Sequence, residues 1–290
     1  MQKGRRTSVQ IFGASICASA LLFGAAPGQA SLFGGYLFDG IADTANPSTI
    51  AEVGGNTGRD LSIGSSADYN ADTPFAYAGN TSFDVTQSIQ NRAANDGMND
   101  YEFDSNNQAW SVSMWIKGNV QGGFTQIVGQ RRQSPGNGWY VGLTSGGAAT
   151  VFTQGQTAGQ ARGVSDTTNL FDGQWHHIVA VNDPASDLDG NGDGEILLYV
   201  DNGAPLNHKK VITETPPVYD TSEFAIGTGR DGGGNYNAYD GLVDEVGIWD
   251  HALTAQEVDQ WYNNSLSTIP EPATFVLLGL GGLLLAYRRR

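Results

Sequence analysis

The sequence is poor in cysteine and in basic residues. Its one cysteine, Cys17, lies in an apolar stretch near the N-terminus, so the rest of the chain can form no disulfide. Lysine and arginine together number 15, against 30 aspartate and glutamate residues. An acidic chain repels nucleic acid, so we expect no nucleic-acid partner. The fold must be held by its hydrophobic core, and carboxylates are available to bind a hard cation such as calcium.

The first 30 residues have the three parts of a secretory signal peptide. A basic start from Lys3 to Arg6 precedes an apolar stretch at 9–26, and small residues, Gly28 and Ala30, come just before Ser31. This pattern predicts export and cleavage between Ala30 and Ser31. An N-terminal membrane anchor is the alternative, but a short run rich in glycine, alanine and serine favours a signal peptide.

The C-terminal tail combines a proline motif, an apolar run that predicts a helix, and a basic end. These are Pro270, Glu271 and Pro272, then residues 273–287, then Arg288, Arg289 and Arg290. The tail, residues 269–290, resembles a PEP-CTERM sorting signal. That resemblance implies removal by an exosortase-type transpeptidase, transient contact with the inner membrane, and a final place at the cell surface or in the extracellular matrix. A plain tail anchor is the alternative, although the run is short of the usual 20 or so residues.

Loss of both ends would concentrate the negative charge. Between Ser31 and Pro272 the chain has nine basic residues and all 30 acidic ones, a formal net charge of −21. The exported body should therefore repel anionic lipid as well as nucleic acid.

Alternating apolar and polar residues predict an all-β body in residues 31–263. No repeat of the length used by solenoids or propellers is present. The region 43–72 is rich in turns and predicts few strands. Strands are expected at 110–117, 139–143, 176–181 and 196–200, and at 224–227 and 242–249, which complete the later sheet.

One short helix is predicted near the end of the body. Thr254 and Glu257 have the spacing of a capping box, and Val258, Trp261 and Tyr262 then lie on one helix face. After this helix, residues 264–268 are expected to form a polar linker to the tail.

Five segments of the body occur in a characteristic order. They are WSVSMWIK from Trp110, DGQWHHIVAV from Asp172, LLYVDNG from Leu197, GLVDEVGIW from Gly241 and ALTAQE from Ala252. Together they resemble the LamG-like jelly roll of the concanavalin A-like lectin/glucanase superfamily. The resemblance implies a two-sheet antiparallel sandwich that binds carbohydrate or protein and often contains a structural calcium.

The most acidic segment is a first candidate for calcium binding. Its ligands would be Asp187, Asp189, Asn191, Asp193 and Glu195. Oxygen-bearing residues at alternate positions followed by glycine reproduce the start of an EF-hand loop. The twelfth position, however, is leucine, and the segment joins two predicted strands. A hydrated hairpin turn is the alternative, because the same residues favour turns.

Asp244 is the second cation candidate. Strand alternation predicts that it shares a face with Leu242 and Val246, opposite to Glu245. A charge among apolar neighbours needs a partner. The family resemblance implies that Asp244 helps bind a calcium together with the N-terminal strand, where Asp39 is the matching residue. The alternative is that Asp244 only accepts backbone hydrogen bonds.

No catalytic residue is expected. His176 and His177 are adjacent on a strand, so they point to opposite faces and cannot bind one metal together. In the resembling family this segment is structural. Its hydrolases carry a Glu-x-Asp-x-Glu strand, but the nearest match here, Glu102-Phe-Asp104-Ser-Asn106, lacks the second glutamate.

Sugar contacts are expected on loops and on nearby aromatic residues. The candidates are Arg131, Tyr140, Asn235 and Tyr236, because rings stack on pyranose faces and amides bind hydroxyl groups. The sequence thus predicts an exported, calcium-stabilised module that binds extracellular polysaccharide. A structural coat protein or a protein-interaction module remains the alternative.

Overall fold

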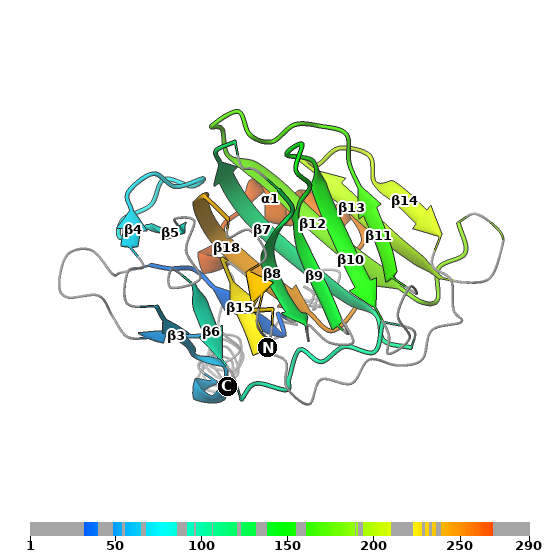
Figure 1. The fold of residues 1–290 in the computed structure, drawn as a ribbon, viewed down its shortest axis with the longest axis horizontal. Helices are drawn as coiled ribbons and strands as arrows, with labels where there is room; N and C mark the ends of the chain where they lie inside the picture. Colours follow the sequence, from blue (N-terminus) through cyan, green and yellow to red (C-terminus); the bar gives the residue numbers. More distant parts are fainter. Residues whose placement is uncertain are drawn as a thin grey trace, which may run out of the picture.

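The computed structural model describes residues 32–39, 49–53, 56–64, 68–85, 92–95, 97–105, 107–120, 123–131, 138–154, 161–188, 190, 194–209, 223–227, 230–231, 234–235 and 239–268. These residues form two antiparallel sheets packed face to face, with one short α-helix (Figure 1). The predicted jelly-roll sandwich is confirmed. The predicted signal peptide, its cleavage site at Ala30 and Ser31, and the tail at 269–290 lie outside the described residues.

The first sheet has the strand order β14–β13–β12–β7–β18–β5–β4, and β1 pairs with the half of β18 that β5 leaves free. Its central strands β7, β12 and β18 are buried almost throughout because both faces of this sheet are covered. The strands are β1 (Gly34–Tyr36), β4 (Asp68–Asn70), β5 (Ser82–Val85), β7 (Trp110–Gly118), β12 (His176–Asp183), β13 (Glu195–Val200), β14 (Leu206–Lys209) and β18 (Gly241–Trp249).

The second sheet has the order β11–β10–β9–β8–β15–β6–β3–β2, and a separate hairpin pairs β16 with β17. Its strands are β2 (Thr49–Ile50), β3 (Leu61–Ile63), β6 (Ala93–Asn95), β8 (Thr125–Arg131), β9 (Gly138–Leu143), β10 (Ala149–Gln154), β11 (Ala161–Ser165) and β15 (Glu223–Ile226), and the hairpin is β16 (Arg230–Asp231) with β17 (Gly234–Asn235). A 3₁₀ turn, η1 (Thr57–Arg59), precedes β3.

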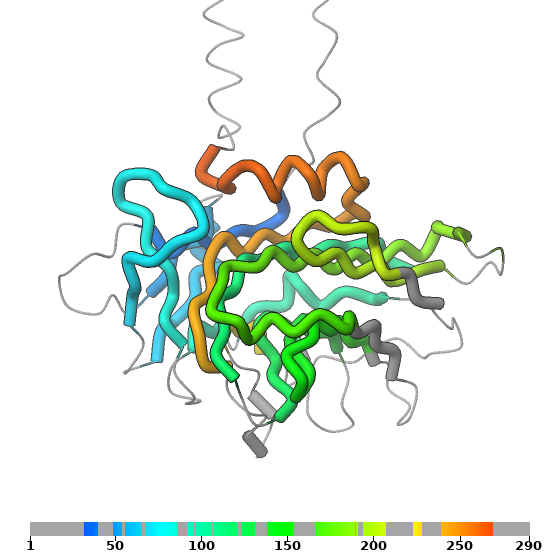
Figure 2. The backbone as a smooth tube through the Cα atoms, turned by 90° about the horizontal axis from the view of Figure 1, so that it is seen from above, coloured from blue at the N-terminus to red at the C-terminus, as the bar shows by residue number. Residues whose placement is uncertain are grey.

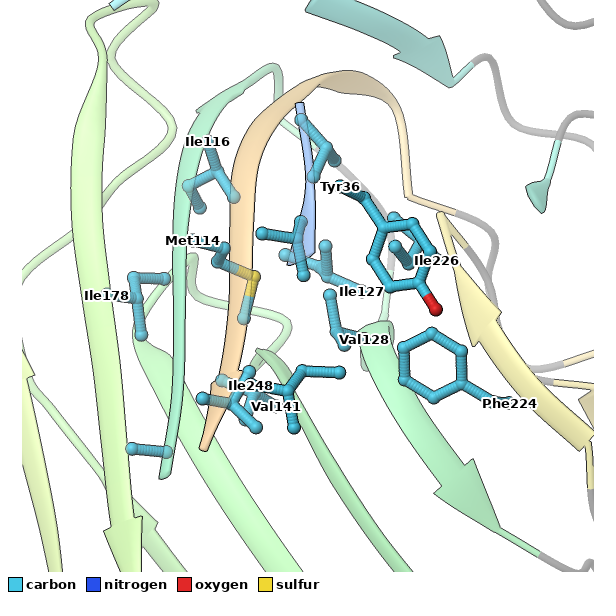
Figure 3. Packing of buried hydrophobic residues seen from close by; sticks show 14 of the residues in the cluster. Tyr36, Met114, Ile116, Ile127, Val128, Val141, Ile178, Phe224, Ile226 and Ile248 are labelled. Carbon is cyan, nitrogen blue, oxygen red and sulfur yellow. The ribbon is translucent and has the colours of Figure 1, made fainter. Parts of the chain in front are cut away.

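The main core lies between the two sheets. Ile248 of the first sheet and Val141 of the second both belong to this core (Figure 3), and the ring of Tyr36 stacks on Phe224 at 5.8 Å. All four side chains are fully buried, and each such burial contributes about 1.5–3 kcal/mol. The alternation predicted for β7 is confirmed, because its even-numbered residues from Trp110 to Ile116 all point into this core.

The helix α1 (Ala255–Asn263) covers the outer face of the first sheet (Figure 2). Its predicted capping box is present: the Thr254 hydroxyl accepts a hydrogen bond from the Glu257 amide, and the Glu257 carboxylate accepts one from the Thr254 amide. Val258 and Trp261 are buried on the sheet, and Tyr262 stacks on Trp115 at 5.4 Å. The helix thereby creates a second, smaller core outside the sandwich.

Two expectations about chain organisation differ from the structure. The segments at 224–227 and 242–249 were expected in one sheet, but β15 pairs with β8 and β6 whereas β18 pairs with β7. Alternation shows that a strand has a buried face but cannot tell which sheet it joins. The expected linker, residues 264–268, instead packs on the body: Ser265 is 5% exposed, Leu266 is 3% exposed, and a 3₁₀ turn, η2 (Leu266–Thr268), follows.

Candidate functional site

A β-bulge in β18 positions the buried acidic residues. Asp244 lies opposite Trp115, but Gly247, three residues later, lies opposite Ser113, so β18 has one extra residue between these pairs. The bulge breaks the alternation on which the sequence prediction rested. Val246 therefore points into the main core. The prediction that Val246 shares a face with Asp244 is wrong.

Asp244 has one satisfied and one unsatisfied carboxylate oxygen. The side chain is fully buried, and Oδ1 accepts a hydrogen bond of 2.8 Å from the Glu245 amide. Oδ2 has no hydrogen-bond partner among the described residues. Burial first, and then the charges of Glu245 and Asp39, raise the pKa of Asp244 to about 9. The structure thus supports the backbone hydrogen bond and also leaves a buried oxygen that lacks a partner.

Glu245 is the extra residue of the bulge, and the sequence prediction did not include it. Its φ angle of 53° is unusual for a residue other than glycine. Its carboxylate accepts hydrogen bonds from the Ser265 hydroxyl and, at 2.6 Å, from the Leu266 amide. Burial raises the pKa of Glu245 to about 7, although these hydrogen bonds oppose the shift.

Asp39 lies in the same cluster because β1 pairs with β18. The Tyr77 hydroxyl is 3.0 and 2.9 Å from the two Asp39 oxygens and 3.2 Å from Glu245 Oε1. This hydroxyl has one proton, so it cannot donate to both carboxylates at once. Burial raises the pKa of Asp39, whereas the hydrogen bond from Tyr77 lowers it.

The cluster of Asp39, Asp244 and Glu245 fits a hard cation by its chemistry. The charges of Glu245 and Asp39 raise the pKa of Asp244, and one buried oxygen of Asp244 has no donor among the described residues. Carboxylate oxygens are the ligands that hard cations prefer. Nevertheless, no three His, Cys, Asp or Glu side chains within the described ranges already stand in metal-binding geometry. Any cation held here would take backbone carbonyl oxygens or water as further ligands.

The acidic hairpin between β12 and β13 is organised differently. Glu195 is 1% exposed, and its carboxylate accepts hydrogen bonds from the Ser186 hydroxyl and from the Leu188 amide at 2.5 Å. The Glu195 carboxylate therefore holds the two sides of the hairpin loop together. Asp187 is exposed to solvent. The remaining predicted ligands, Asp189, Asn191 and Asp193, lie outside the described residues.

The two adjacent histidines make different contacts. His176 is held between Asp201 (Nδ1 to Oδ2, 2.7 Å) and Asp172 (Nε2 to Oδ1, 2.9 Å). Burial would lower the pKa of His176, but the hydrogen bonds to these two carboxylates outweigh it and raise the pKa. His177 is buried under α1, its Nε2 lies 2.7 Å from the Ser113 hydroxyl, and burial lowers its pKa to about 3.

Three aromatic side chains gather on the outer face of the second sheet. Tyr140 and Phe152, which are partners across β9 and β10, stack at 5.0 Å, and Phe124 meets Tyr140 edge-on at 5.7 Å. Tyr140 is 4% exposed, whereas Phe124 and Phe152 are half-buried. The sequence prediction included Tyr140 but missed both phenylalanines, because each lies outside the strand segments that it used.

A family model described as the concanavalin A-like lectin/glucanases superfamily matches residues 91–259. The chain belongs to this superfamily. A second model, the PEP-CTERM protein-sorting motif, matches residues 268–290. The predicted sorting signal is thereby confirmed: the protein is exported and processed at the membrane. In the described part of the chain, no helix has the length and apolarity needed to cross a bilayer.

Several solved structures of binding domains share the superfamily fold. The binding domain of botulinum neurotoxin serotype G matches at a TM-score of 0.53 and 14% identity over 73% of this chain and 48% of that one. The binding domain of Paraclostridial mosquitocidal protein 1 matches at a TM-score of 0.56 and 12% identity, over 80% of this chain and 51% of that one. The botulinum neurotoxin serotype D ligand binding domain, in complex with N-acetylneuraminic acid, matches at a TM-score of 0.53 and 13% identity, over 81% of this chain and 50% of that one.

The chain spans about half the length of these structures, and at such identities the likeness concerns the fold alone. Among curated proteins, none matches the chain.

The remaining predicted site residues are only partly placed. Glu102 and Asp104, the candidate hydrolase pair, do not lie on a strand, and Asp104 accepts a hydrogen bond of 2.7 Å from Asn107. Asn106 lies outside the described residues. Arg131 ends β8 and Asn235 ends β17, and the structure describes only their backbone. Tyr236 and the sorting residues Pro270, Glu271, Pro272, Arg288, Arg289 and Arg290 lie outside the described part of the chain.

Proposed function

We propose that the sandwich is a carbohydrate-binding module of the cell surface or matrix, with its sugar site at Phe124, Tyr140 and Phe152. The aromatic cluster is the observation that carries this proposal. The half-buried rings of Phe124 and Phe152 can stack on the apolar faces of pyranose rings, and the buried Tyr140 between them holds their orientation. Phe152 stacks on Tyr140, which limits the movement of both rings.

The position of the cluster supports a binding role. It lies on the second sheet, and the helix covers the first sheet, so α1 does not obstruct it (Figure 2). Arg131 and Asn235, which the sequence prediction assigned to the sugar site, lie on β8 and on the β16–β17 hairpin. One relative in fold is a ligand binding domain in complex with N-acetylneuraminic acid. The ligand class proposed here is an extracellular polysaccharide.

Calcium is proposed as a stabilising ion at the bulge. Asp39 and Asp244 would hold it, as the superfamily resemblance implies, and Glu245 lies close enough to contribute charge. A bound divalent cation would supply the positive charge that the buried Asp244 oxygen lacks. The acidic hairpin at Asp187 is a weaker candidate because Glu195 already accepts hydrogen bonds from its own loop. No hydrolase activity is proposed, because Glu102 and Asp104, the nearest match to the catalytic pair, lie outside the strands of the described residues.

A glycan array tests the proposal. The purified body should retain a subset of polysaccharides, and Phe152→Ala should reduce that binding several-fold. The matched control is Phe75→Ala, because Phe75 is a half-buried phenylalanine that packs on Trp115 of the first sheet. Bound oligosaccharides should be recovered uncut. Equal binding by both variants would show that the sugar site lies elsewhere. No binding to any glycan would favour a structural coat protein.

A further inference from the structure

The point at which the chain leaves the folded body is held in place by Glu245. The carboxylate of Glu245 accepts hydrogen bonds from Ser265 and from the Leu266 amide. Leu266 is 3% exposed and packs in the second core with Trp249 and Trp261. We call residues 264–268 the exit clasp. They are fixed to the outer face of the first sheet by both polar and apolar contacts.

Hydrogen bonds within the exit clasp extend this order to its last residue. Asn264 Nδ2 donates to the Gln260 carbonyl at 2.8 Å, which joins the exit clasp to α1. The Thr268 amide and hydroxyl both donate to the Ser265 carbonyl, at 3.0 and 2.7 Å. Thr268 is therefore part of the folded body, and it is also the first residue that the sorting motif matches.

Chain geometry then sets a limit on the spacer. A chain extends at most about 3.6 Å per residue, so Pro270 lies within about 7 Å of Thr268, and Ala273, the first residue of the apolar run, lies within about 18 Å. A free linker of five more residues would double this reach. The exit clasp removes that freedom, so the body stands directly at the place where the tail enters the membrane.

We propose that the exit clasp holds the helix-bearing face of the sandwich against the membrane for as long as the tail is attached. The outer face of the second sheet, with Phe124 and Phe152, then points away from the membrane. The partner of the helix-bearing face is the lipid surface beside the tail. This orientation follows from the sorting motif and the exit clasp, and it does not depend on sugar binding.

The charge of this face indicates that the short tether, and not adhesion, maintains the contact. The side chain of Asp250, just before α1, is 60% exposed, and Asp259 on α1 is also exposed. Carboxylates near a bilayer that contains anionic lipid are repelled. A longer tether should therefore let the body move away from the membrane, and removal of the tail should release it.

Single-cysteine labelling of the full chain tests the orientation, because Cys17 is the only natural cysteine. In a Cys17→Ser background, Ala255→Cys places a thiol on the exposed start of α1, and Ser62→Cys places one on exposed β3 of the second sheet. The chain is expressed in a bacterium without an exosortase, and spheroplasts are treated with a maleimide on a large polyethylene glycol. Ala255→Cys should react several-fold more slowly than Ser62→Cys.

Two further variants isolate the tether. About ten glycine and serine residues inserted after Thr268 add a flexible coil of roughly 18 Å, and labelling of Ala255→Cys should then equal that of Ser62→Cys. Leu266→Ala, which loosens the exit clasp, should give a partial increase. Equal labelling of the two faces without the insertion would overturn the proposal. So would protection that survives the insertion, an unchanged rate in Leu266→Ala, or failure of the chain to remain with the membrane.

Discussion

The two acidic regions of this protein differ in how their carboxylates are satisfied. In the β12–β13 hairpin, Glu195 accepts hydrogen bonds from Ser186 and Leu188 of the same loop, and Asp187 is in contact with solvent. At the β18 bulge, Asp244 is fully buried and one of its oxygens has no donor among the described residues. The hairpin is conspicuous in the sequence, whereas the bulge contributes only two acidic residues.

We infer from this difference that burial, and not the density of acidic residues, decides where a cation would affect stability. An exposed carboxylate such as Asp187 pays little desolvation cost, so the absence of a cation should change its contribution to stability only slightly. A buried carboxylate without a partner costs several kcal/mol or takes up a proton. We therefore expect the bulge to dominate the response of the protein to calcium and to pH.

The largest effect is expected for Asp244. In chelator and below about pH 4, near the unfolded pKa values of Asp and Glu, the contribution of these two protonated carboxyl groups to stability is fully present. That contribution should be lost as the pH rises toward their folded pKa values, about 7 for Glu245 and about 9 for Asp244. Each unit of pKa shift corresponds to about 1.4 kcal/mol. Asp244→Asn should therefore raise the melting temperature in chelator at pH 8.

Calcium should raise the melting temperature of the unmodified chain more than that of Asp244→Asn. In the unmodified chain, millimolar calcium should raise the melting temperature by several degrees, since saturation at 100 times Kd contributes about 2.7 kcal/mol. In Asp244→Asn this rise should be small. Thermal unfolding with calcium and with chelator measures both effects. Identical unfolding curves for the unmodified chain would contradict the proposal that calcium stabilises the fold.

A smaller effect is expected for His176, whose pKa is also raised but which lies outside the bulge. Its paired, charged form contributes stability below the unfolded pKa of about 6.5, and that stability is lost as pH rises through the higher folded value. His176→Gln should cost about 1 kcal/mol or less at pH 5.5, because both aspartate partners are partly exposed.

The same variant separates the two sources of pH dependence. His176→Gln should leave the calcium response unchanged, since His176 lies outside the bulge cluster. Urea unfolding at several pH values, with and without calcium, gives both quantities. A calcium response that disappears in His176→Gln would show that His176 and the bulge cluster are coupled, so the two sources of pH dependence would not be separate.

The smallest effect is expected for Asp187. Asp187→Asn changes an exposed carboxylate in the hairpin, so its stability should change by about 0.5 kcal/mol or less. The calcium-induced shift in melting temperature should remain close to that of the unmodified chain. If Asp187→Asn removed more of this shift than Asp244→Asn, the hairpin would be the principal cation site and the comparison would be reversed.

Much of the fold could be predicted from the sequence because it depends on local patterns. The alternation from Trp110 to Lys117 gave the central strand β7, and the spacing of Thr254 and Glu257 gave the start of α1. The resemblance of five ordered segments gave the sandwich. These features rest on neighbours close in sequence or on a family pattern, and the structure confirms them.

The bulge and the aromatic cluster could not be predicted in this way. Alternation assumes an unbroken strand, and one extra residue at Glu245 reverses it for Val246. A signal that could have suggested a bulge is Gly247, where a Cβ atom would come within 2.4 Å of the Trp249 ring. Phe124 and Phe152 meet Tyr140 only because their strands pair, and pairing joins residues that are distant in sequence.

The sequence by itself determined that this protein is an exported, acidic all-β protein with a sorting tail, because composition, alternation and terminal motifs are local properties, and the family resemblance of five ordered segments implied the sandwich. Only the tertiary structure decided which carboxylates are buried together and that residues 264–268 belong to the body. Asp39 approaches Asp244 through the pairing of β1 with β18, and Leu266 joins a core that includes Val179 and Leu197 from much earlier in the chain. Burial of a charge or of a linker depends on all the surfaces that meet there, and no single segment contains that information.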